Sequence, residues 1–514
     1  MRGSASSRPS LERLRSTPKL PMLLNSRNQA EARLSTAKDH KCKDYFGRWH
    51  SVKDLRDRRN AAILKGMRWM HKFLTADRHL ALIEIGDDAA CIFFEIWSSS
   101  ILRGAARGIA QDLLEKYETH ILEGPRCNCH FCHGQICKRL RGRELFIELM
   151  YLIRCKDEMG LDASAMLKRA DELWQREGLH DTDKLFGMEI KGFHKIPDSD
   201  WVVNIMNIMI MEFNQLLFPR RWPIKWGLKE TFEFIRGHRF FGPPYDREFR
   251  FHDSFYFVTH IAFAITAYSA IKMNPKDVPW LYNYNRRGCL YWVKMARYRE
   301  STVPDLLLDI DGLSEAMDVL RGCGMTDGGD RLLCSATLAL LKLQQPDGSW
   351  PHWELDILHR GPHGEPLAAS GKPNFYERVH PTWVAVQSLR DRNFDYDRKG
   401  NVRWGHYMAK LLKQSNLRKL ESKVSYRKWP SLRKKKYKPV EAEPLELEEV
   451  SPLEPEEPEE PEDAETQWKA LLMIGTADDE VETESEAAEP DGLSTDVAAD
   501  SANVAESPFG LGRI

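Results

Sequence analysis

Apolar residues recur at intervals of three and four along most of the chain, the spacing that places them on one face of an α-helix. The alternating pattern of a half-buried strand is almost absent, so the sequence predicts an all-α protein. Six segments are apolar on most sides and are expected to be buried. They begin near Asp87, Arg143, Asp200, Asp253, Asp305 and His380, which are 56, 57, 53, 52 and 75 residues apart.

A helix with a single apolar face follows each of these segments. Such a helix pair recurs about every 50 residues, which is typical of a protein built from structural repeats. A helix that is apolar all round must be buried, whereas a striped helix can face water. The alternation predicts an (α/α)6 toroid, two concentric rings of helices, over residues 53–414. An open solenoid of the same pairs is the alternative. The outer helices are expected at residues 104–120, 163–176, 228–236, 285–299, 329–343 and 401–417, with a further helix at 54–74.

The formal net charge of −1 conceals a strong division of charge along the chain. Residues 439–514 carry 24 acidic and two basic residues and many prolines, so they are predicted to be a disordered acidic tail. Residues 1–41 are predicted to be a disordered basic arm. Residues 415–438 form a basic linker, within which ten basic residues and several aromatic residues lie at positions 418–438. This linker is either a solvated connection or a patch for nucleic acid or nuclear localisation.

No apolar segment typical of a secretory signal follows Met1. The ten cysteines are therefore expected to be reduced, and the protein to be intracellular, in the cytoplasm or the nucleus. The basic N-terminal arm is also compatible with an organellar transit peptide, although Glu12 and Glu31 weaken that interpretation. Two long apolar runs, residues 201–218 and 255–271, contain polar residues and are expected to be buried helices rather than membrane spans.

The segment Leu343-Gln-Gln-Pro-Asp-Gly-Ser-Trp350 lies at the end of a predicted outer helix. Its Asp-Gly pair suits a tight turn, a glutamine side chain can cap the helix end, and Trp350 can pack back on the helix. The segment resembles the Gln-Asp-Gly-Ser-Trp motif of the terpenoid cyclase and protein prenyltransferase superfamily, whose fold is an (α/α)6 toroid. Residues 304–325 and 374–389 resemble the acidic and the histidine-bearing inner helices of that superfamily. The resemblance implies the fold and says nothing about the substrate.

The catalytic motifs of that superfamily are not reproduced residue by residue. Class II terpene cyclases protonate a polyene with Asp-x-Asp-Asp, but the matching residues here are Asp309-Ile310-Asp311-Gly312, which lack the fourth carboxylate. Protein prenyltransferases hold zinc with an Asp, a Cys two residues later and a His from a later helix. Here Asp311 stands at the position of that Cys, while His380 could match the His. The resemblance therefore leaves the reaction open.

Charged residues inside apolar helices mark candidate functional positions, because burying a charge is unfavourable unless the charge is paired or functional. These residues are Glu95, Glu148, Glu212, His260 and Glu315. In a closed ring, the catalytic candidates that would converge in the central cavity are His260, Asp309, Asp311, Glu315 and His380. Carboxylate and imidazole groups of this kind bind a divalent metal such as zinc, or act as a general acid and base. Buried ion pairs with arginines are the structural alternative.

Helical geometry separates these candidates. Asp311 and Glu315 are four residues apart and therefore share one face of a helix. Asp309 precedes Asp311 by two residues, about 200° round the helix, so it reaches the same site only if the first turn is irregular. The sequence thus favours Asp311, Glu315, His260 and His380 over Asp309.

A dense cysteine cluster follows the first helix pair and consists of Cys127, Cys129, Cys132 and Cys137. Two histidines lie within it, and the set could hold zinc, but its spacing differs from the paired C-x2-C of common zinc sites. A structural metal site, reduced thiols in a loop and redox chemistry all remain open. No P-loop, Gly-x-Gly-x-x-Gly, Gly-x-Ser-x-Gly or His-Glu-x-x-His motif is present, so no nucleotide cofactor is expected.

Two hypotheses about function fit these features. The first is an enzyme whose cavity presents carboxylate and imidazole groups to a small apolar molecule or a peptide, with lyase, cyclase and transferase chemistry all open. The second is a non-catalytic toroid that serves as a binding scaffold and uses its charged flanks for partners. Metal content and an occupied central pocket favour the enzyme, and a collapsed centre filled by side chains favours the scaffold. The oligomeric state is left open.

Overall fold

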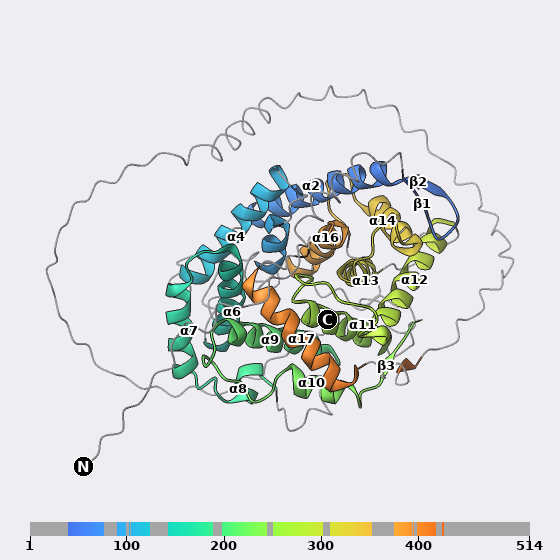
Figure 1. Cartoon of the computed structure of the whole chain (residues 1–514). Coiled ribbons are helices and arrows are strands. Elements are labelled where there is room, and N and C mark those ends of the chain that lie inside the picture. Colours follow the sequence, from blue (N-terminus) through green and yellow to red (C-terminus); the bar gives the residue numbers. More distant parts are fainter. Residues whose placement is uncertain are drawn as a thin grey trace, which may run out of the picture. The chain divides into compact units, whose positions relative to one another are not determined.

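Helices make up most of the chain that the computed structural model describes, which confirms the mostly helical prediction (Figure 1). The described residues are 40–76, 90–98, 102, 104–123, 142–188, 198–243, 250–301, 309–351, 375–392, 394, 398–417 and 424–425. All of them belong to one compact unit that ends at Pro430. The acidic tail, the cysteine cluster and nearly all of the basic arm lie outside the described residues.

The predicted apolar segments form the most deeply buried helices. These are α6 (Gly142–Met159), α9 (Asp198–Leu217), α11 (Arg250–Thr266), α13 (Ile310–Gly322) and α16 (Phe375–Leu389), together with helical residues 90–98. Every residue of α13 is buried. Along the sequence α6 packs on α9, α9 on α11, α11 on α13 and α13 on α16. None of the helices within the described ranges is long and apolar enough to cross a membrane.

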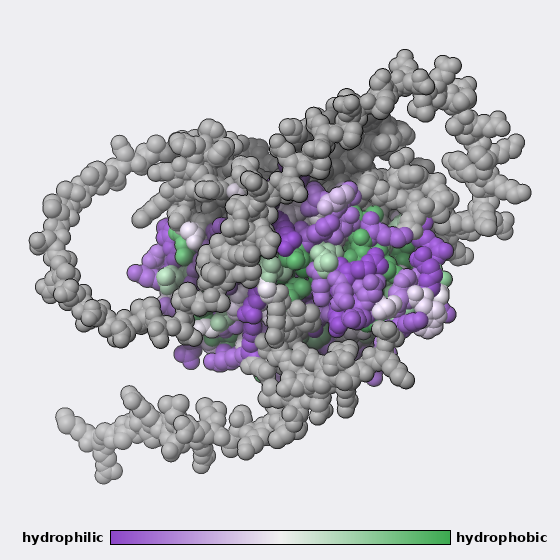
Figure 2. Space-filling view, turned by 90° about the horizontal axis from the view of Figure 1, so that it is seen from above, coloured by the Kyte–Doolittle hydropathy of each residue, from purple (hydrophilic) through white to green (hydrophobic). Residues whose placement is uncertain are grey.

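Most of the more amphipathic helices lie outside this group in Figure 1, and the last of them crosses in front of it. They are α2 (Val52–Ala76), α4 (Ala105–Glu123), α7 (Ser164–Arg176), α8 (Thr182–Phe186), α10 (Leu228–Ile235), α12 (Pro279–Ser301), α14 (Arg331–Leu343) and α17 (Lys399–Ser415). Helix α7 illustrates the pattern, because it buries Met166, Ala170, Leu173 and Trp174 along one stripe and packs on α6. Figure 2 shows that hydrophilic residues cover much of the coloured surface on one face, with hydrophobic residues in separate small areas.

Two of the buried helices begin at other residues than the sequence indicates. Helix α16 begins at Phe375, so His380 lies inside the helix rather than at its start. The following Pro381 suggests a first turn, where proline is favoured, but here it lies in the interior of the helix. Helix α13 begins at Ile310 with Asp309 as its N-cap, whereas Asp305 lies outside the described residues.

Short strands tie both ends of the described chain to the helices. Strand β1 (Lys41–Lys43) pairs antiparallel with β2 (Trp49–Ser51), and Asp44 closes the loop by accepting from the backbone N–H groups of Phe46 and Arg48 at 2.9 and 2.8 Å. Strand β3 (Phe240–Phe241) pairs in parallel with β4 (Val424–Ser425). The last two residues of the predicted arm, and residues 415–417 and 424–425 of the predicted linker, are therefore part of the folded unit.

The Gln-Asp-Gly-Ser-Trp segment joins three helices. Trp350 is buried, and its indole N–H donates to the Leu340 carbonyl of α14 at 2.8 Å, so it packs back on that helix as expected. Gln344 reaches α2 by donating to the Ala62 carbonyl at 2.9 Å. The backbone N–H of Trp350 donates to Thr382 Oγ1 of α16 at 2.9 Å. The segment therefore fixes α2 and α16 to the end of α14.

Candidate functional site

A cavity lies among α11, α13, α16 and the helical residues 90–98. It encloses about 400 Å³ of empty space, part of which is open solvent. Three of the five predicted catalytic residues, His260, Glu315 and His380, line it together although they come from three helices. The complete lining is Ile92, His260, Phe263, Tyr268, Glu315, Asp318, His380, Trp383, Val384 and Gln387.

Helix α13 presents carboxylates to this region along one face. Asp311, Glu315 and Asp318 are spaced by four and three residues, which places them one above the other on consecutive turns. All three are buried, with relative exposures of 9%, 4% and 2%. Because an isolated buried carboxylate is strongly disfavoured, each of them is expected to have a polar or charged partner.

The partner of Glu315 comes from α11. Its Oε2 accepts a short hydrogen bond from the Thr259 hydroxyl and lies 3.8 Å from His260 Nδ1. The same Nδ1 lies 2.8 Å from the Tyr256 carbonyl oxygen, which can only accept. Nδ1 therefore carries the proton, and in the neutral ring Nε2 holds the basic lone pair.

The partner of Asp311 comes from α16. His380 Nδ1 lies 3.0 Å from Asp311 Oδ2, and both side chains are 12% exposed. A carboxylate at Nδ1 holds the proton on that nitrogen, stabilises the imidazolium and leaves Nε2 as the basic atom of the neutral ring. The His380 ring also meets Trp383 edge-on, with ring centroids 4.9 Å apart. In this pair the carboxylate itself lies within hydrogen-bond distance of Nδ1, whereas at His260 the Tyr256 carbonyl takes that place and Glu315 lies farther away.

Asp309 has a different role from the other candidates. It precedes α13 as the N-cap, and its Oδ1 accepts from the Gly312 backbone N–H at 2.6 Å. Tyr256 Oη contacts both carboxylate oxygens at 3.2 and 3.3 Å. A Cβ on Gly312 would lie 2.5 Å from Asp309 Oδ2 and 2.9 Å from Trp292 Nε1, so a side chain there would require these groups to shift.

Buried ion pairs neutralise the carboxylates on one side of the cavity. Arg390 pairs with Glu95, and Arg392 pairs with Asp318 and, at 3.5 Å, with Glu95. Gln387 Nε2 donates to Glu95 Oε2 at 3.3 Å and to Asp318 Oδ2 at 3.4 Å. At Glu95 the structural alternative, a buried ion pair with arginine, is thus realised.

The other two candidate acids, Glu148 and Glu212, are half-buried and also connect helices. Glu148 accepts a short hydrogen bond from the Tyr117 hydroxyl of α4. Glu212 on α9 accepts from the Leu228 backbone N–H at 3.1 Å and from the Tyr407 hydroxyl at 2.8 Å, which links α9 to α10 and α17. Burial raises the pKa of Glu212 to about 7, although these two hydrogen bonds act in the opposite direction.

The interpretation of the cavity residues as a divalent-metal site is not supported by this geometry. Among the residues that the structure describes, no group of three or more His, Cys, Asp and Glu side chains could hold a metal ion. His260 with Glu315 and His380 with Asp311 are instead two separate pairs. The zinc candidates Cys127, Cys129, Cys132 and Cys137 lie outside the described residues, so that site stays a prediction.

The sequence analysis missed several residues of the cavity, and helical spacing could have found them. Asp318 follows Glu315 by three residues, on the same face of α13. Trp383 and Gln387 follow His380 by three and seven residues and share its face of α16. The neighbouring arginines, in contrast, follow the end of α16, where periodicity gives no signal.

Comparisons with known protein families, curated proteins and solved structures find no match to this chain.

Proposed function

We propose that the buried helices close into the inner ring of an (α/α)6 toroid. The packing order α6, α9, α11, α13 and α16 supports this, and residues 90–98 supply the sixth member. Cys155 Sγ of α6 lies 3.8 Å from the Ala90 carbonyl oxygen, and Gln387 of α16 donates to Glu95, so residues 90–98 contact both ends of the series. An open solenoid leaves its two terminal repeats apart, and these contacts argue against it.

We further propose that the protein is an enzyme that moves protons on a small, largely apolar substrate in this cavity. The observation that carries the proposal is the pair of imidazole–carboxylate units, His260 with Glu315 and His380 with Asp311, at one cavity. Each unit can hold a proton as imidazolium or accept one at Nε2. Two such units allow one histidine to remove a proton from the substrate while the other delivers a proton elsewhere.

The walls of the cavity restrict the substrate. Ile92, Phe263, Trp383 and Val384 supply apolar and aromatic surface, and Tyr268 adds a ring with a hydroxyl group. These side chains leave little space between them, which favours a compact molecule over a peptide. Proton transfer on such a molecule corresponds to isomerisation, elimination or cyclisation.

Deuterium incorporation tests this proposal even while the substrate is unidentified. The purified protein is incubated in D₂O with a small-molecule extract, and mass spectrometry searches for compounds that gain deuterium or change in abundance. The native protein is expected to label or convert a compound, and His260→Ala and His380→Ala are expected to reduce the rate by about 10²-fold or more. His71→Ala is the matched control, because His71 pairs with Asp112 away from the cavity.

The binding-scaffold alternative gives the opposite result. A scaffold leaves the extract unlabelled and unconverted, whichever histidine is present. Labelling that is equal in the native protein and the two cavity variants would assign the chemistry to another site or to a contaminant, and would end the proposal for this cavity.

A further inference from the structure

Two cysteines that are far apart in the sequence meet beneath the N-terminal hairpin. Cys42 on β1 and Cys334 on α14 are 292 residues apart in sequence, and their Sγ atoms are 2.9 Å apart. Both residues are buried, at 3% and 0% relative exposure. A disulfide bond has an S–S length of about 2.05 Å, so the two sulfur atoms need to approach by less than about 1 Å to be joined.

The surroundings of the two thiols keep them away from solvent and in the protonated form. Leu55 is buried against both cysteines, and Val52, Leu338 and Leu341 complete the apolar cluster. Burial raises the pKa of both thiols, so neither is readily converted to the reactive thiolate while the hairpin is seated. An oxidant therefore reaches the pair when the hairpin lifts from α14.

We propose that Cys42 and Cys334 are a redox modification site, at which a low-molecular-weight disulfide of the glutathione type converts them to an intramolecular disulfide. Lifting of the three-residue strand β1 exposes Cys42, whose thiolate attacks the small disulfide and releases one thiol. The Cys334 thiolate then attacks Cys42 Sγ in the mixed disulfide and releases the second thiol. Two protein thiols are oxidised, one small disulfide is reduced to two thiols, and the two protons pass to the thiolates released.

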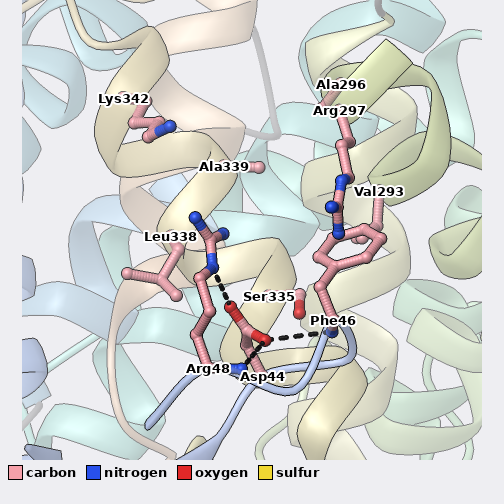
Figure 3. A pocket seen from close by; sticks show the side chains of 10 residues that line it. All are labelled: Asp44, Phe46, Arg48, Val293, Ala296, Arg297, Ser335, Leu338, Ala339 and Lys342. Atoms are coloured by element: carbon pink, nitrogen blue, oxygen red, sulfur yellow. Dashed lines mark hydrogen bonds and ion pairs between the residues drawn. The ribbon is translucent and has the colours of Figure 1, made fainter. Parts of the chain in front are cut away.

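The bond would fix one wall of a neighbouring pocket. Figure 3 shows this pocket between the hairpin loop, α12 and α14, with Arg48, Arg297 and Lys342 around it and Asp44 at the hairpin. Leu338 belongs both to the pocket lining and to the apolar cluster around the thiols. Apart from the two thiols, the loop is held to α14 by the Tyr45 backbone N–H, which donates to Ser335 Oγ at 2.8 Å, and by Arg331 Nε, 3.2 Å from the Asp44 carbonyl oxygen. A disulfide bond would hold the hairpin on α14 until the bond is reduced.

Peptide mapping of the full-length protein tests the proposal directly. The protein is equilibrated with oxidised or reduced glutathione, both in buffer and in sub-denaturing urea, where transient opening of the hairpin admits the oxidant. Free thiols are then alkylated in denaturant, and peptides are analysed without reduction. We expect a disulfide-linked peptide pair containing Cys42 and Cys334 in the oxidised samples, which disappears on reduction.

Thermal unfolding provides the second measurement. Closing a loop of 292 residues restricts the unfolded chain, so oxidation is expected to raise the melting temperature by about 5 °C. This rise should be absent in Cys42→Ala and retained in Cys289→Ala, a control that changes a buried thiol on α12. Recovery of Cys42 and Cys334 as alkylated thiols in every oxidised sample, or their linkage to other cysteines only, would overturn the proposal whatever the melting temperature does.

Discussion

Replacing Glu212 by glutamine should remove a pH-dependent loss of stability where α9 meets α10 and α17. The carboxyl group has a pKa of about 7 in the folded protein, against an ordinary value of 4.5, because burial disfavours its charged form. A group whose pKa is raised by folding contributes its full stability below the unfolded pKa and loses it as the pH rises through the folded pKa. Glu212 therefore weakens the native state progressively between about pH 4.5 and pH 7.

The size of the effect follows from these two pKa values. At about 1.36 kcal/mol for each pKa unit, ionisation of Glu212 lowers the free energy of unfolding by about 3 kcal/mol above pH 7. Partial exposure of Glu212 to solvent reduces this to about 2–3 kcal/mol. A glutamine mimics the protonated acid, because its carbonyl can accept from the Leu228 N–H while its amide donates to the Tyr407 oxygen.

Urea unfolding followed by circular dichroism between pH 4.5 and 8.5 measures the difference between the two proteins. The variant should gain about 2–3 kcal/mol relative to the native protein on going from pH 4.5 to pH 8.5. Glu233→Gln, on the exposed side of α10, should show no such gain. Parallel stability curves for the native protein and Glu212→Gln would refute the assignment of a raised pKa to this residue.

Further changes probe the turn, the buried ion pairs and the cavity. Gly348→Ala should lower stability by about 1–3 kcal/mol in chemical unfolding, because φ is +101° and a Cβ would lie 2.6 Å from the Lys65 carbonyl oxygen; no loss would show that the turn rearranges freely. Arg154→Met should lower the free energy of unfolding by about 3–5 kcal/mol, because Glu158 would lose a buried partner at 2.9 Å. Adding Glu158→Gln should restore part of that loss. His380→Ala should reduce the proposed activity by about 10²-fold or more and leave the melting temperature within about 2 °C. A loss of about 3–5 kcal/mol would instead identify the Asp311 pair as structural.

The local pattern of the sequence determines where the helices lie and which faces they bury. The spacing of apolar residues and the local composition are properties of neighbouring residues. The apolar segments and the striped helices that follow them can therefore be recognised without knowing the fold. The same locality explains the Gln-Asp-Gly-Ser-Trp turn, whose contacts with Leu340 lie within one helix and its end. It also explains Asp311 and Glu315, which share a face because they are four residues apart.

Helix starts are less well determined, for an equally local reason. Acidic residues and prolines mark more than one position as a suitable first turn. Asp305 and Asp309 are both plausible caps before the same apolar run, and the structure has Asp309 as the cap of α13. At His380 the adjoining proline suggests a start, but α16 begins five residues earlier, at Phe375.

The partners of the buried polar groups are decided only by the tertiary structure. Glu95 and Glu315 have equivalent positions in the sequence pattern, yet Glu95 pairs with Arg390 and Glu315 lies beside His260. No local feature of the sequence indicates which residues will pair. Glu95 and Arg392 are 297 residues apart, and Cys42 and Cys334 are 292 residues apart. A sequence shows that a buried charge must have a partner, because the desolvation penalty is local to that residue. Which residue becomes the partner depends on how all the helices pack together, and that is a property of the whole fold.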